Sequence, residues 1–310
     1  MGFTKEIINV FPERISTVLS NIPDKECNKI QEIRLRAKKP LMVVKNSEDY
    51  FLDDKGQITK SLKDAFIVEV FDIDKTIKRM SNYSLYSVDD EIRNGFITLV
   101  GGHRVGIVGR VVLDNNSIKT IRNISGINLR IAREIKGCSK EILKLAYKEG
   151  LKHTLIVSPP GCGKTTILRD IIRNISNGND ELNIKGYKVG VVDERGEIAA
   201  CYYGVPQLDV GIRTDVIDSC PKVIGINLLL RSMGPEVIAV DEIGSLEDAK
   251  AIQDALKSGV KIIATAHGKD LDEVKNRIGI KEMLENKFFE VVIVLSKRQG
   301  PGTIDKIIYL

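Results

Sequence analysis

The chain has 310 residues and a formal net charge of +5, with 43% hydrophobic and 29% charged residues. The length is enough for about two domains with packed cores, and the composition is ordinary for a globular protein. A charge this small for the length does not by itself indicate a nucleic-acid partner.

The cysteines and the apolar runs argue against several further classes of protein. The cysteines are Cys27, Cys138, Cys162, Cys201 and Cys220. They form neither a CxxC pair nor a Cys/His cluster, which argues against a zinc site and a disulfide framework. The first residues lack an apolar signal core, and no apolar run approaches the roughly 18 residues of a membrane span. We therefore expect reduced thiols in a cytoplasm, with any membrane role supplied by a partner.

The N-terminal half alternates helical and extended patterns. Apolar residues recur at helical spacing from 5 to 19, and Pro12 divides this stretch into two short helices. The next elements that periodicity predicts are strands at 32–36 and 40–44 and helices at 72–82 and 87–94. The strands alternate apolar with polar residues, which is typical of a sheet with one face in water.

A glycine-rich hairpin follows these elements. Residues 96–100 run into a stretch from Gly101 to Arg110 with glycines at the turn and within the second strand. Further strands are expected at 118–121 and 127–131. These elements predict a smaller α+β N-terminal domain, residues 1–134, with a mostly antiparallel sheet.

In the second half, short β-branched runs alternate with helical stretches. The runs lie at 154–157, 188–192, 237–240, 260–264 and 289–295. Such alternation predicts a parallel sheet covered on both faces. We expect an α/β domain over residues 135–310, entered through a helix at 139–147. Ligands of such sheets bind beyond the carboxyl ends of the strands.

The first of these strands leads into a glycine loop that opens a helix, the context of a Walker A loop. The first glycine of the strict pattern is replaced by Ser158. Gly161 and Gly163 let backbone N–H groups face phosphate oxygens, while Lys164 can reach the β- and γ-phosphates. The residues expected to bind ATP or ADP are Pro159, Pro160, Gly161, Cys162, Gly163, Lys164, Thr165 and Thr166.

Two other strands end in acidic residues. The run at 237–240 ends in Asp241 and Glu242, a Walker B pattern. Asp241 and the Thr165 hydroxyl are expected to hold Mg²⁺, and Glu242 to polarise the attacking water. Glu194 follows the strand at 188–192 and competes for the same catalytic role. Its alternative is a solvated loop acid or a salt-bridge partner of Arg195, and the residues alone leave the choice of base open.

Polar residues also follow the strand at 260–264. His267 can sense the γ-phosphate through a hydrogen bond made only with ATP bound. Phosphoryl transfer commonly uses an arginine as well, often from a neighbouring subunit. Arg104 and Arg110 are attractive because nearby glycines permit close approach, although a solvated hairpin fits equally. The other candidates are Arg130, Arg133, Arg213 and Arg231. Residues 204–218 are expected to form a mobile loop near the site.

Several motifs resemble the stage III sporulation protein AA family of endospore-forming bacteria. They are SLYSV at 84–88, GGHRVG at 101–106, the loop at 158–166, VDERGE at 192–197, RSMGPE at 231–236 and ATAHG at 264–268. That family is similar to the type II and type IV secretion ATPases. In those hexameric rings an N-terminal domain covers a nucleotide held by a RecA-like domain.

The resemblance implies a RecA-like P-loop ATPase domain with a parallel-rich sheet, preceded by the smaller α+β domain. It places Glu194 in an acidic "Asp box" and His267 in a "His box", and it favours Arg104 and Arg110 as groups that reach the phosphates. Cys162, inside the loop, suggests sensitivity to thiol modification.

The function implied is an ATP-hydrolysing motor or assembly ATPase of a secretion-like channel at the forespore membrane. The implied protein is a homo-hexamer in the mother-cell cytoplasm that uses ATP/ADP and Mg²⁺ and contacts membrane proteins of the channel. A nucleotide-gated assembly factor that scarcely turns over remains an alternative. So does a RecA-like nucleic-acid motor, against which the small number of aromatic residues argues.

Overall fold

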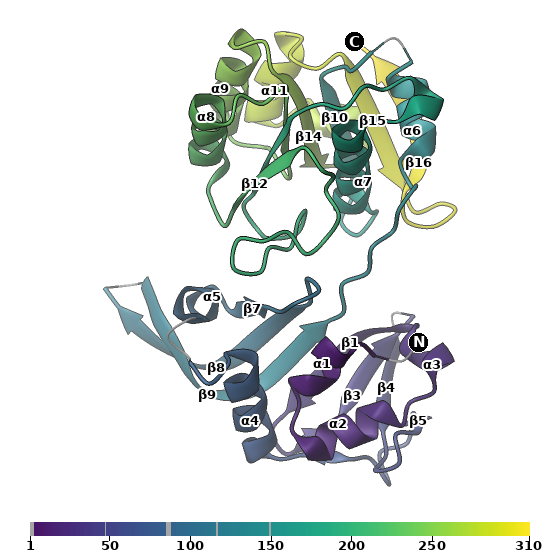
Figure 1. The fold of residues 1–310 in the computed structure, drawn as a ribbon, viewed down its shortest axis with the longest axis vertical. Coiled ribbons are helices and arrows are strands. Elements are labelled where there is room, and N and C mark those ends of the chain that lie inside the picture. Colours follow the sequence, from purple (N-terminus) through teal and green to yellow (C-terminus); the bar gives the residue numbers. More distant parts are fainter. Residues whose placement is uncertain (1–2, 47, 85–87, 116, 149) are drawn as a thin grey trace. The chain divides into compact units, whose positions relative to one another are not determined.

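A computed structural model describes residues 3–46, 48–84, 88–115, 117–148 and 150–310. The chain divides into two compact units, Met1–Arg133 and Glu134–Leu310. Each unit has its own sheet and helices (Figure 1). Within the described ranges, no helix combines the length and the apolar character needed to cross a membrane.

The N-terminal unit is built on an antiparallel sheet with the strand order β5-β4-β3-β1-β9-β8-β7. Its strands are β1 (Ile30–Arg36), β3 (Met42–Lys45), β4 (Glu48–Leu52), β5 (Ile58–Thr59), β7 (Phe96–Thr98), β8 (Arg104–Asp114) and β9 (Ser117–Arg130). A separate short pair joins β2 (Lys39–Pro40) and β6 (Ile67–Val68). The helices are α1 (Lys5–Asn9), α2 (Glu13–Ser20), α3 (Asp24–Cys27), α4 (Val70–Met80) and α5 (Asp89–Arg93).

The core of this unit lies between the sheet and helices α1, α2 and α4 (Figure 1). Phe11 and Ile15, both fully buried, pack in one apolar cluster with Ile33 of β1 and Leu129 of β9. Pro12 separates α1 from α2, as predicted, because its ring cannot continue a helix.

The sequence was misleading about β9. The strands expected at 118–121 and 127–131 form one continuous strand instead. Asn123, inside it, adopts a left-handed backbone with φ 47°, and the pairing with β8 shifts register between Val108 and Arg110. The turn-like residues are therefore an irregularity within a long strand. Residues 85–87, in the SLYSV motif and at the start of the helix expected at 87–94, lie outside the described ranges.

The C-terminal unit holds a sheet in the order β12-β11-β13-β14-β10-β15-β16, parallel except for β16. Its strands are β10 (Thr154–Ser158), β11 (Val189–Asp193), β12 (Thr214–Asp218), β13 (Val237–Val240), β14 (Lys261–His267), β15 (Val291–Ser296) and β16 (Thr303–Tyr309). Its helices are α6 (Lys140–Ala146), α7 (Lys164–Asn177), α8 (Lys222–Ser232), α9 (Leu246–Lys257), α10 (Leu271–Val274) and α11 (Ile278–Glu285), with a 3₁₀ turn at Asp180–Leu182.

Helices cover both faces of this sheet (Figure 1). Helices α8, α9 and α11 pack on the face that carries Ile238 and Val240, and α6 and α7 pack on the face that carries Ile156 and Ala239. Every residue of β10 and β13 is buried. Burial on both faces explains why these strands are continuous apolar runs.

The parallel register brings the carboxyl ends of four strands to one edge. Ser158 pairs with His267, Val192 with Val240, and Val240 with Ala264. The glycine loop after β10, the acids after β11 and β13 and the end of β14 are therefore neighbours. This edge carries the candidate site.

The sequence predicts a loop over residues 204–218, but only part of this segment is a loop. Its last residues form β12, which pairs in parallel with β11. All five residues of β12 are only half-buried, because this strand lies at the end of the sheet order. With polar residues at both ends, TDVID, this edge strand lacks the continuous apolar run by which its neighbours were recognised.

Candidate active site

The loop between β10 and α7 has the backbone of a phosphate cradle. Gly161 and Gly163 have φ of 68° and 84°, the left-handed region that glycine adopts without a steric cost. A Cβ added at Gly161 would lie 3.0 Å from Lys297 Nζ. Helix α7 begins at Lys164, directly after Gly163, so its free N–H groups and its dipole face the loop. The loop is therefore shaped to hold an anion.

The Lys164 ammonium lies inside this loop. It donates to the backbone carbonyl of Ser158 at 3.3 Å and contacts His267 Nδ1 at 3.0 Å. Lys164 is 5% exposed, and burial lowers the pKa of its amine, against the opposing influence of nearby Asp241 and Glu242. A buried cation with few compensating partners favours the arrival of an anion.

The carboxylate of Asp241 joins the loop to the neighbouring strands. The Thr165 hydroxyl donates to Asp241 Oδ2 at 2.6 Å, and the hydroxyl of Thr265 donates to Oδ1. Hydroxyl and carboxylate oxygens are the ligands that Mg²⁺ prefers. Thr165 and Asp241 thus fit the ion expected at this position, and Thr265 fixes the orientation of the carboxylate.

Glu242 is held at the centre of the site in a strained backbone. Its φ is 54°, a region that costs a non-glycine residue about 1–3 kcal/mol. Its N–H donates to Thr265 Oγ1 at 3.0 Å, and its Oε1 lies 2.6 Å from His267 Nε2. The pattern is satisfied when Lys164 donates to Nδ1 and the imidazole donates from Nε2 to the Glu242 carboxylate.

The two competing glutamates have different surroundings. Glu194 forms an ion pair with Lys222, at the first turn of α8, whereas Glu242 is bonded within the chain of groups that includes Lys164. Arg195 pairs with Glu242, whereas the sequence indicated this arginine only as one alternative partner of Glu194. A hollow of about 10 Å³ lies among these side chains, which is roughly the space of one water.

The comparisons with known proteins decide the family. The family model described as "Sporulation stage III, protein AA" matches residues 2–309. The chain belongs to this family. The Stage III sporulation protein AA of Bacillus subtilis (strain 168) is 39% identical over 302 residues, which cover 97% of this chain and 94% of that protein.

Two solved structures share the fold of this member of the sporulation stage III, protein AA family. The Legionella pneumophila ATPase DotB aligns with a TM-score of 0.54 at 16% identity, over 95% of this chain and 76% of that chain. The pilus retraction motor PilT with bound ADP aligns with a TM-score of 0.55 at 16% identity, over 87% and 75%. The expected architecture, a RecA-like P-loop ATPase domain after a smaller α+β domain, is confirmed.

The structure places the candidate arginines in different settings. Arg104 and Arg110 lie on β8 of the N-terminal unit, where the Arg104 guanidinium stacks 3.7 Å from the centroid of the Phe96 ring. Arg133 donates to the Ile30 carbonyl at 2.6 Å. This hydrogen bond, within the N-terminal unit, indicates a structural role for Arg133.

The remaining arginine candidates also have local partners or open surroundings. Arg213 donates to the carbonyls of Ser176 and Asn177, at 2.8 and 3.1 Å, and so caps the end of α7. Arg130, whose side chain is exposed, lies 3.3 Å from the more buried Glu32. Arg231 is exposed near the end of α8.

Cys162 is less accessible than its position in the loop suggested. It is 2% exposed, and its carbonyl accepts from the N–H of Gly302 at 2.8 Å. Its burial argues against ready modification of the thiol. All five cysteines are free.

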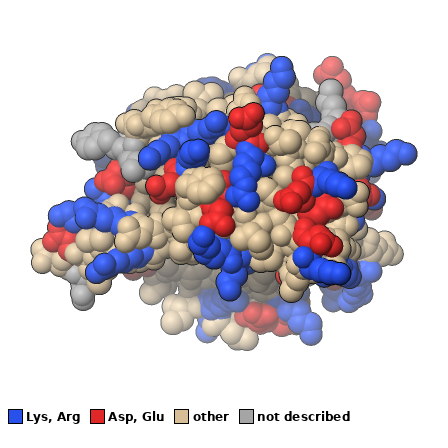
Figure 2. Space-filling model, turned by 90° about the horizontal axis from the view of Figure 1, so that it is seen from below, with Lys and Arg blue, Asp and Glu red and all other residues tan. Residues whose placement is uncertain are grey.

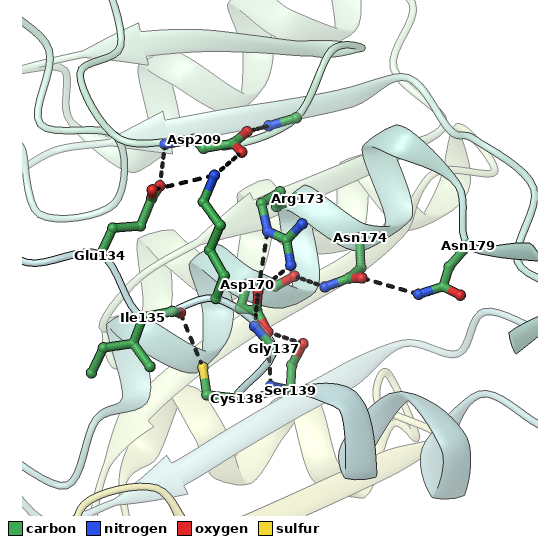
Figure 3. Close-up of polar contacts among 12 residues, drawn as sticks. Glu134, Ile135, Gly137, Cys138, Ser139, Asp170, Arg173, Asn174, Asn179 and Asp209 are labelled. Carbon is green, nitrogen blue, oxygen red and sulfur yellow. Dashed lines mark hydrogen bonds and ion pairs between the residues drawn. The ribbon is translucent and has the colours of Figure 1, made fainter. Parts of the chain in front are cut away.

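A buried carboxylate anchors the segment before α6 to the glycine-loop helix (Figure 3). Asp170 of α7, 2% exposed, accepts from the N–H of Gly137 at 3.0 Å and from the N–H and hydroxyl of Ser139 at 2.8 and 2.7 Å. The Arg173 guanidinium donates to the same carboxylate at 2.6 Å. The first residues of the C-terminal unit are thus tied to the helix that begins at the site.

Arg195 and Lys297 are cations at this site that sequence reasoning did not assign to it. The sequence indicated Arg195 only as an alternative partner of Glu194, its neighbour in the chain, and the strand register was needed to bring it to Glu242. Lys297 follows the last residue of β15 and reaches Gly161 across the edge. The position of Lys297, directly after a strand that ends beside the glycine loop, was the signal in the sequence that could have indicated its place at the site.

Proposed function

We propose that the chain binds ATP with Mg²⁺ at the carboxyl edge of its parallel sheet and hydrolyses it. The convergence of the glycine loop, Thr165–Asp241 and Lys164–His267–Glu242 at one edge supports this proposal. These are the parts that phosphoryl transfer needs: a phosphate cradle, a cation, oxygen ligands for Mg²⁺ and an acid that orients water.

Each group has a separate role in this proposal. The loop N–H groups and Lys164 bind the phosphates, and Thr165 with Asp241 holds the ion. When bound, Mg²⁺ would neutralise part of the negative charge of the phosphates. His267 keeps the Glu242 carboxylate in place through its Nε2–H. Glu242 orients a water and takes its proton as the water oxygen bonds to the γ-phosphorus and the bond to ADP breaks.

Paired variants test which glutamate is the base. Glu242→Gln should lower the rate of phosphate release at least about 100-fold, the usual contribution of a general base, and should retain bound ATP. Glu194→Gln should lower it less than about fivefold, because Glu194 is paired with Lys222 and stands outside the chain of contacts that joins Lys164, His267 and Glu242. A larger loss in Glu194→Gln than in Glu242→Gln would move the role to Glu194.

We also propose the cellular role implied by the resemblance. The chain would act as a homo-hexameric ring in the mother-cell cytoplasm, held at the forespore membrane by membrane proteins of a secretion-like channel that it powers or assembles. The fold shared with an ATPase and a pilus retraction motor supports a motor role. Arg104 or Arg110 would complete the site from the N-terminal unit of a ring subunit.

The two alternatives have direct tests. A gated assembly factor would bind ATP and ADP but release no phosphate even as wild type. A nucleic-acid motor would bind single-stranded DNA with an affinity that falls steeply with salt. On the face drawn in Figure 2, Lys and Arg side chains are interspersed with Asp and Glu, a mixture that does not favour the nucleic-acid alternative over the channel role.

A further inference from the structure

The loop that follows β11 is fixed to the glycine-loop helix. The Asp193 carboxylate accepts from the N–H groups of Glu197 and Ala199, at 2.9 and 2.8 Å. Arg169, on α7, donates to the carbonyls of Glu197 and Ile198. Two buried side chains, Asp193 at the end of β11 and Arg169 on α7, therefore fix the position of the turn that carries residues 194–196. Arg195 projects from a positioned backbone.

Arg195 forms one end of a chain of charged groups. Its guanidinium pairs with Glu242, whose other oxygen lies 2.6 Å from His267 Nε2. His267 Nδ1 in turn lies 3.0 Å from Lys164 Nζ. One oxygen of Glu242 is thus linked through His267 to Lys164 of the glycine loop, and the other oxygen is paired with Arg195.

The two partners of this ion pair differ in their freedom to move. The side chain of Arg195 is 61% exposed, whereas that of Glu242 is 18% exposed. Glu242 is further held by His267 and by the bond from its N–H to Thr265. A rearrangement at the site would therefore move the guanidinium more readily than the carboxylate.

We propose that Arg195 is the residue through which the site distinguishes a nucleoside triphosphate from a diphosphate. With no third phosphate present, the guanidinium neutralises Glu242. A terminal phosphate next to Glu242 offers a doubly charged partner, two of whose oxygens an arginine can bind at once. The guanidinium moves to that phosphate, and Glu242 is released to orient water. This inference rests on the proposed ATP site.

The test compares the affinities of two probes, ADP and a triphosphate with a non-cleavable β,γ-imido bridge, both with Mg²⁺, by competition against a fluorescent nucleotide. Arg195→Ala should weaken triphosphate binding at least tenfold and change ADP binding less than twofold. It removes a charge-assisted contact and leaves Glu242 facing the terminal phosphate without a counter-ion. Arg195→Lys should fall between, because it keeps the charge and loses the planar fork.

Arg277→Ala is the matched control, since Arg277 is also an exposed arginine in an ion pair, with Glu273 on α10. It should keep the wild-type ratio of the two affinities. An unchanged ratio in Arg195→Ala, or an equal loss for both probes, would overturn the inference while leaving the ATP site intact. Wild-type protein that binds neither probe would overturn the proposed function together with it.

Discussion

The buried carboxylate of Asp170 gives the sharpest test of the structural account. Burial opposes its ionisation, but the donors of Arg173, Ser139 and Gly137 outweigh it and lower the pKa of Asp170 below its ordinary value. In Asp170→Asn an amide N–H₂ replaces one accepting oxygen and faces buried donors (Figure 3). One or two unpaired buried groups, at about 1–3 kcal/mol each, predict a loss of about 3 kcal/mol in the free energy of unfolding.

Urea unfolding followed by far-UV circular dichroism measures this loss. Ser139→Ala, which removes only the hydroxyl donor, should cost about 1 kcal/mol. Asp254→Asn, an exposed acid paired with Lys257, is the control and should stay within about 0.5 kcal/mol of wild type. An Asp170→Asn protein as stable as this control would refute the account of the anchor.

The same carboxylate predicts a dependence on pH. Because the pKa of Asp170 is lowered in the folded state, its stabilisation is present above the pKa of the unfolded chain, near 3.9 for an aspartate. It is lost as the pH falls through the folded value. Wild type should therefore lose more stability than Asp170→Asn on acidification below about pH 4, and parallel curves would contradict this.

Three further predictions concern other parts of the molecule. Gly161→Ala should lose about 1 kcal/mol of stability and bind ADP more weakly, because φ is 68° there; unchanged melting and affinity would count against the cradle. Burial lowers the pKa of His103, whose Nδ1 accepts a hydrogen bond from the N–H of Ala132. Because protonation of this histidine favours the unfolded chain, the stability of the protein should fall as the pH drops below about 6.5. The fall should be smaller in His103→Gln. Burial raises the pKa of Cys201 to about 12, and Cys162 is only 2% exposed. A thiol reagent should therefore modify both cysteines only in denaturant, and rapid labelling of both in the native protein would show open structure.

Much of the C-terminal fold could be predicted from its sequence, since local signals there agree with the tertiary structure. Continuous apolar runs indicated β10, β11, β13, β14 and β15 because both faces of these strands are buried. The edge strand β12 was missed because its residues are only half-buried. The continuity of β9 was missed because pairing with β8 on both sides of Asn123, at Arg122 and at Gly126, overrides the local turn propensity.

The residues of the candidate site also differ in how far local sequence signals reveal them. Lys164, Thr165 and Asp241 could be recognised because each belongs to a local motif with its own spacing. The partners of Glu242 could not be, because Arg195 and His267 reach it from other strands. The sequence left a pair between Arg195 and Glu194 as one alternative and gave no sign of the pair that Glu194 forms with Lys222. Which acid meets which cation follows from strand register, and no short sequence motif encodes register.

The most direct test of the central claim is phosphate release from ATP per subunit, measured over a range of protein concentrations for wild type and Lys164→Ala. The account predicts release by wild type that rises with concentration, as subunits assemble and complete each other's sites, and none above background for Lys164→Ala. Equal release by both proteins would mean that the glycine loop is not the site of hydrolysis. No release by wild type at any concentration, with ATP still bound, would contradict the proposed ATPase.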